Sequence, residues 1–114
     1  MARVEITVTT ISRDGVAPAS QVTSDATNDH VIEGNDGRVV LEAQNVDAGS
    51  AHTVTVTTPG SVAGLAIADL EVSVPASSTR WIGPFPTTVF NQTGTDDVNI
   101  DVATANLRFR AYKI

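Results

Sequence analysis

The stretch Asp36–Pro86 decides the fold, because β-strand patterns follow one another there with turn residues between them. The segments read DGRVVLEAQN (36–45), HTVTVTT (52–58), DLEVSVP (69–75) and TRWIGPFP (79–86). Side chains alternate between polar and apolar along them, most strictly in the second segment, and this period of two is typical of half-buried strands. Short strands spaced in this way predict an all-β fold, an antiparallel β-sandwich of a single domain. The patterns leave open whether its topology is immunoglobulin-like or jelly-roll.

The chain before this stretch, residues 1–37, is expected to form an N-terminal strand and a long polar loop or arm, with residues 38–114 as the sandwich body. Val4–Ile11 alternates cleanly and predicts an edge strand, or one that pairs with a neighbouring subunit. Within the polar loop, 21–23 and 29–33 are possible short strands. We expect further strands at 88–91, 98–102 and 107–112, and a loop rather than a helical turn at 61–68.

Composition excludes several classes of function. The chain has 114 residues, a net charge of −6 and no cysteine. Acidity argues against nucleic-acid binding, which requires cationic surface to replace phosphate counterions. The absence of cysteine removes disulfides and thiolate chemistry. Nothing resembles a signal peptide or the roughly 20 apolar residues of a membrane span, so we expect synthesis in the cytoplasm and no membrane partner.

Catalytic and metal-binding patterns are weak. His30 and His52 are expected to be structural or simply exposed, and Asp96, Asp97 and Asp101 lack the spacing of a calcium loop. No nucleophile elbow, zinc motif or phosphate loop occurs. The sequence therefore predicts a non-enzymatic protein without a cofactor.

Candidate contact residues come instead from the aromatic and cationic positions. Arg80, Trp81 and the Gly83–Pro86 segment suit an interface, since Arg and aromatic residues are enriched at such surfaces. The alternative for Phe85 is a plug that closes one end of the sandwich. In the last strand, Arg108 and Arg110 form either a solvated face or an electrostatic docking stripe. With the N-terminal strand included, the predicted interface comprises Val4, Ile6, Val8, Arg80, Trp81, Phe85, Arg108 and Arg110.

Three segments together resemble the small all-β virion proteins encoded by tailed bacteriophages, of the capsid decoration or cement type. They are DGRVVLE (36–42), AHTVTVTTPG (51–60) and RWIGPF (80–85), and the resemblance covers roughly Asp36–Gln92. It implies a protein that binds the major capsid protein on the outer surface of a phage head, commonly as a homotrimer, and stabilises the shell. Many identical moderate contacts would then add up through avidity.

Two other functions stay open at this point. One is a phage tail or head–tail connector subunit, which would assemble as a ring or tube. The other is a carbohydrate-binding or adhesion module, which would present an aromatic platform to a glycan. The segment 1–37 is expected to reach the shell or a neighbouring subunit by strand addition.

Overall fold

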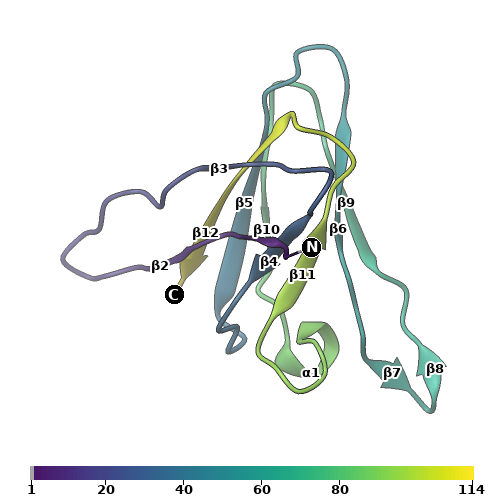
Figure 1. Cartoon of the computed structure of the whole chain (residues 1–114). Coiled ribbons are helices and arrows are strands. Elements are labelled where there is room, and N and C mark those ends of the chain that lie inside the picture. Colours follow the sequence, from purple (N-terminus) through teal and green to yellow (C-terminus); the bar gives the residue numbers. More distant parts are fainter. Residues whose placement is uncertain (1) are drawn as a thin grey trace.

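Two β-sheets stack face to face in the computed structural model, which describes residues 2–114 apart from the Val62 side chain (Figure 1). Sheet A has the strand order β1-β4-β11-β6-β9. Sheet B has the order β10-β5-β12-β2, and β3 also pairs with β12. The strands of sheet A are β1 (Val4–Glu5), β4 (His30–Ile32), β6 (His52–Val56), β9 (Leu70–Val74) and β11 (Val98–Asp101). Those of sheet B are β2 (Val8–Thr10), β3 (Val22–Thr23), β5 (Val39–Asn45), β10 (Thr79–Ile82) and β12 (Leu107–Lys113).

The core fills the space between the sheets, as the alternation predicts. In β5 the residues Val39, Leu41 and Ala43 are fully buried, and the residues between them face outward. The same pattern in β12 buries Leu107, Phe109 and Ala111. Sheet A supplies the opposite wall, with Ile32, Val54, Val56, Val74, Val98 and Ile100. The predicted β-sandwich is therefore confirmed.

Two of the strand pairings are parallel, so the sheets are mixed rather than wholly antiparallel. β1 pairs in parallel with β4, and β2 pairs in parallel with β12. The expected single strand Val4–Ile11 is thus split, because the chain leaves sheet A after Glu5 and enters sheet B at Val8. Between them Ile6 is fully buried, and its N–H donates to the carbonyl of Val31 at 2.8 Å.

The segment 1–37 contributes more to the sandwich body than an arm would. It supplies β1 to β4, and every residue of β4 is buried between β1 and β11. The short strands expected near 21–23 and 29–33 are present as β3 and β4. The longest run of exposed residues in this segment is 11–18, which we call the projecting loop; in Figure 1 it extends between β2 and β3, away from the sheets.

Two local expectations need correction. The segment expected as a strand at 88–91 is a short helix, α1 (Thr87–Phe90), which follows Pro86. The Phe90 ring packs edge-on against Phe85 at 5.4 Å between centroids, so packing outweighs the β-propensity of this segment. The expected loop at 61–68 contains a two-stranded hairpin, β7 (Ser61–Val62) and β8 (Leu65–Ala66). Ala63 and Gly64 both have positive φ, as a tight hairpin turn requires.

Candidate functional site

The outer face of sheet B gathers the aromatic and cationic residues that the sequence singles out. We define the sheet-B face by its outward side chains, Val40, Glu42, Gln44, Trp81, Arg108, Arg110 and Tyr112. Strand register places Trp81 opposite Glu42 and Glu42 opposite Arg110, so these three form one row across β10, β5 and β12. The Arg110 guanidinium donates to Glu42 at 3.2 Å.

Trp81 is the most prominent side chain of this face. Its exposed fraction is 59%, although tryptophan usually buries most of its surface. The indole stacks on Tyr112 with a centroid distance of 5.6 Å and an angle of 24° between the rings. Trp81 therefore presents a wide apolar surface in a fixed orientation.

Residues 19–21, which follow the projecting loop, hydrogen-bond to side chains of the sheet-B face. The Ala19 N–H donates to the Tyr112 hydroxyl at 3.1 Å, and Arg110 Nε donates to the Ala19 carbonyl at 3.0 Å. Gln21 donates to Gln44 at 3.2 Å. Because the Tyr112 hydroxyl and the guanidinium of the neighbouring Arg110 are both held by hydrogen bonds, Tyr112 forms a rigid surface on which the Trp81 ring stacks.

The structure places the eight predicted interface residues in three kinds of environment. Trp81, Arg108 and Arg110 share the sheet-B face, and Arg80 is exposed on the adjoining edge strand β10. Val4 and Val8 are half-buried in β1 and β2. Ile6 and Phe85 are fully buried in the core, which leaves them no side-chain surface for a partner and removes them from the interface set. Phe85 packs inside the sandwich, which agrees with the alternative prediction that this ring is a plug.

Sequence reasoning did not select Tyr112 and Glu42 as contact residues. Alternation does place Tyr112 beside Arg108 and Arg110, which was a usable signal. The contribution of Glu42 depends on which strand lies next to β12, and the strand patterns do not give that pairing.

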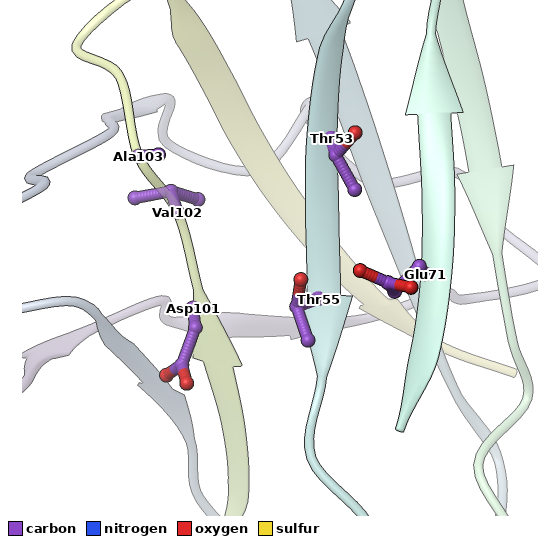
Figure 2. A pocket seen from close by; sticks show the side chains of 6 residues that line it. All are labelled: Thr53, Thr55, Glu71, Asp101, Val102 and Ala103. Carbon is purple, nitrogen blue, oxygen red and sulfur yellow. The ribbon is translucent and has the colours of Figure 1, made fainter. Parts of the chain in front are cut away.

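A second candidate lies on the outer face of sheet A, where a shallow groove of about 270 Å³ is present (Figure 2). It is lined by Thr53, Thr55, Glu71, Asp101, Val102 and Ala103. Figure 2 shows the Glu71 carboxylate turned toward Thr55, whereas that of Asp101 points away from both. Asp101 is already paired with Arg3 at 2.6 Å. The groove offers two threonine hydroxyl groups and one unengaged carboxylate, and its lining residues include no imidazole that could activate a hydroxyl.

The histidines have structural environments. His30 is fully buried; its Nε2 accepts a hydrogen bond from the Asp25 N–H at 2.8 Å, and its Nδ1 lies 3.2 Å from the Val4 carbonyl. This geometry assigns the proton to Nδ1 of a neutral ring, and burial lowers the pKa of His30 below its ordinary 6.5. His52 Nε2 lies 2.9 Å from Asp47. Within residues 2–114, no three His, Asp or Glu side chains come together in an arrangement that could hold a metal ion.

Comparisons with protein-family models, with curated proteins and with solved structures found no match to the chain. Within residues 2–114, helices of the length and apolar character that a membrane span requires are absent.

Proposed function

We propose that this chain is a non-enzymatic structural subunit of a virion, a decoration protein that binds the outer surface of a tailed-phage capsid. Its resemblance to such proteins in three sequence segments supports the proposal. The observation that carries it is the placement of exposed apolar side chains at three separate positions on a rigid sandwich. A subunit that bridges several neighbours needs several contact surfaces, whereas a small-ligand binder needs one concave site.

The three positions belong to different elements. The projecting loop exposes Ile11 and Val16, with exposed fractions of 48% and 47%. The hairpin formed by β7 and β8 exposes Leu65 at 73%, and the sheet-B face exposes Trp81. In Figure 1 the projecting loop and the hairpin extend from opposite sides of the sandwich. Single exposed apolar residues are common on soluble proteins, but residues on projections of this kind are suited to insertion into a partner.

Co-sedimentation tests the proposal directly. Shells assembled from the major capsid protein encoded in the same genome should carry the decoration protein into the pellet at a fixed ratio. Val16→Asp in the projecting loop should reduce this binding at least tenfold, whereas Val46→Asp, an equally exposed position after β5, should not. Failure of the unaltered chain to bind such shells would reject the proposal.

A carbohydrate-binding module is the second candidate, because the exposed Trp81 ring, stacked on Tyr112, offers a flat apolar surface for a sugar ring. Under this function Trp81→Ala alone should abolish binding to an immobilised glycan array, and Val16→Asp should have no effect. Glycan binding without shell binding would favour this candidate.

A further inference from the structure

The two sheets carry opposite charge. The strands of sheet A contain three acids, Glu5, Glu71 and Asp101, and neither lysine nor arginine. The strands of sheet B contain four cations, Arg80, Arg108, Arg110 and Lys113, and a single acid, Glu42. On the sheet-B face itself Arg108 and Arg110 outnumber the single acid Glu42, so cations predominate on one face of a molecule with a net charge of −6. Complementary faces of this kind favour a particular orientation between associating molecules.

The hairpin of residues 61–68, which we call the apolar hairpin, is attached to the acidic side. The chain between Thr53 and Thr79 contains Asp69 and Glu71 but no lysine, arginine or histidine. Both acids are exposed and directly follow the hairpin. The hairpin itself has no charged residue, and Leu65, directly after its turn, is 73% exposed.

The base of the apolar hairpin is anchored to the sandwich. Buried Thr58 donates its hydroxyl to the carbonyls of Ile67 and Ala68, at 2.8 and 3.1 Å, and its N–H to Asp69 at 2.9 Å. A Cβ on Gly60 would lie 3.1 Å from the Thr88 carbonyl oxygen of α1, so the incoming strand packs closely on that helix. Anchoring of this kind lowers the conformational entropy that binding removes.

The sheet-B face has the matching properties. Trp81 and Tyr112 provide the apolar surface, and Arg108 lies on the same face. Arg80 is exposed on the edge strand β10, where alternation directs it to the side opposite Trp81. The two guanidinium groups hydrogen-bond to backbone carbonyls, Arg80 to Thr79 and Arg108 to Ala105 and Leu107. Across residues 2–114 neither of them is paired with a carboxylate, so both are free to meet an acidic partner.

We propose that a second copy of this chain occupies the sheet-B face: the apolar hairpin of one copy packs on Trp81 and Tyr112 of the next. Asp69 and Glu71 of the first copy then meet Arg108 on the same face of the second. Because the two surfaces differ, the contact is head-to-tail, and repetition gives either a closed ring or an open filament. The inference deepens the proposed function, and rests on it, in taking the chain to be an assembly subunit.

A second copy of the chain accounts for both the apolar hairpin and the sheet-B face. An anionic lipid surface would be repelled by Asp69 and Glu71 beside the hairpin, and the chain between Thr53 and Thr79 has no lysine or arginine to attract it. A sugar bound to Trp81 would not account for the exposed apolar side chain of Leu65.

Sedimentation velocity on the purified chain, without capsid shells, tests the proposal with two variants, Leu65→Asp and Trp81→Ala. Both positions are exposed, so both variants should fold. The unaltered chain should form an oligomer, and each variant alone should sediment as a monomer. An equimolar mixture should form dimers and nothing larger, because the hairpin of the Trp81→Ala copy fits the intact face of the Leu65→Asp copy. The control Val46→Asp should assemble as the unaltered chain does.

Raising the salt concentration from about 0.1 M to about 1 M should weaken the association at least tenfold, because it shortens the screening length from about 10 Å to about 3 Å. A monomeric unaltered chain, a mixture that stays monomeric, or variants that assemble normally would each overturn the proposal. So would Leu65-dependent binding of the monomer to phosphatidylcholine or phosphatidylserine vesicles. An oligomer that behaves as expected but ignores capsid shells upholds the head-to-tail contact and rejects capsid decoration.

Discussion

Trp81 and Phe85 lie four residues apart but have opposite environments. Trp81 follows the alternation of β10 and points outward, while the next residue, Ile82, is buried. Gly83 then interrupts the strand with φ +120°, a conformation that L side chains rarely adopt. A Cβ there would lie 3.0 Å from the Val39 carbonyl oxygen, so the glycine also allows close approach to β5. After this bend Phe85 enters the core.

Alanine substitution should separate the two aromatic residues. Trp81→Ala is expected to lower the free energy of unfolding by only about 1 kcal/mol, the value of a surface aromatic pair. Phe85→Ala should cost about 3–5 kcal/mol, because it leaves a cavity in a packed core. Urea denaturation followed by circular dichroism measures both. Equal losses for the two variants would contradict their assigned environments.

His30 should make the fold sensitive to mild acid. Burial chiefly lowers the pKa of its ring; Asp25 and Asp29 oppose this effect and Arg3 adds to it. A group with a lowered cationic pKa binds protons more readily when the chain is unfolded. Stability is therefore complete above pH 6.5 and declines as the pH falls through 6.5 toward the lower folded pKa.

An NMR titration of the two imidazoles checks this prediction. The His30 resonances should titrate below pH 6.5, and the unfolding midpoint should fall over the same range. His52→Gln is the control and should retain that acid sensitivity. A His30 ring that titrates above 6.5 would mean that the neutral, two-hydrogen-bond arrangement is absent in solution.

The N-terminal segment is the element that joins the two sheets. β1 pairs with β4 in sheet A, β2 pairs with β12 in sheet B, and Ile6 fills the core between them. Arg3 extends the connection by donating to Asp101 and to the His30 carbonyl, the latter at 3.1 Å. This segment thus belongs to the folding unit of its own chain.

Removal of residues 1–12 should consequently destabilise the sandwich itself. The truncation deletes two strands, and Ile6→Ala alone should cost about 2–5 kcal/mol through its cavity. Thermal unfolding measures both variants. Thr7→Ala, at an exposed neighbouring position, should stay within about 0.5 kcal/mol of the unaltered chain. A truncated chain with an unchanged melting temperature would show that the segment is an independent arm.

The sequence pattern predicted which segments form strands better than it predicted how those strands pair. Alternation correctly indicated β5, β6, β9, β10, β11 and β12, because one face of each strand is buried. It failed at Val4–Ile11, where a clean pattern conceals a transfer between sheets. It also failed at α1, since the four residues Thr87–Phe90 are too few to show a helical period and their β-branched and aromatic side chains indicate a strand.

At the scale of the whole molecule, the candidate site was only partly predictable. The sequence indicated Trp81 and the cations of the last strand, because aromatic and charged residues are conspicuous in a threonine-rich chain. The Trp81–Tyr112 stack depends on β5 lying between β10 and β12. The opposite charge of the two sheets depends on the same three-dimensional arrangement.

Strong acid should destabilise the domain. Asp25, Asp36 and Asp47 all have a pKa below the ordinary 3.8. Backbone N–H groups of Asn28 and Gly49 are the main causes for Asp25 and Asp47, and the Lys113 ammonium is the main cause for Asp36. Carboxylates with lowered pKa stabilise the fold above pH 3.8, and this contribution is lost as the pH falls below it.

Circular dichroism between pH 5 and pH 2 measures that loss, with pH values chosen to bracket the ordinary carboxyl pKa of about 3.9. Asp36→Asn should remove part of the transition and lower stability at neutral pH, because Lys113 loses its partner at 2.9 Å. Asp14→Asn, in the exposed projecting loop, should leave the profile unchanged. A cooperative fold that persists at pH 2 would show that these carboxylates contribute little.

The position of β12 has a consequence for synthesis on the ribosome. This strand ends one residue before Ile114, yet it forms the middle of sheet B and is the partner of β2, β3 and β5. Those three strands emerge first and have no β12 to pair with until residues 107–113 have left the ribosome. The nascent polypeptide therefore exposes unpaired strand edges while the intervening residues are being made. A premature stop codon near residue 106 would leave an open half-sandwich, a product suited to chaperone capture or degradation rather than to assembly.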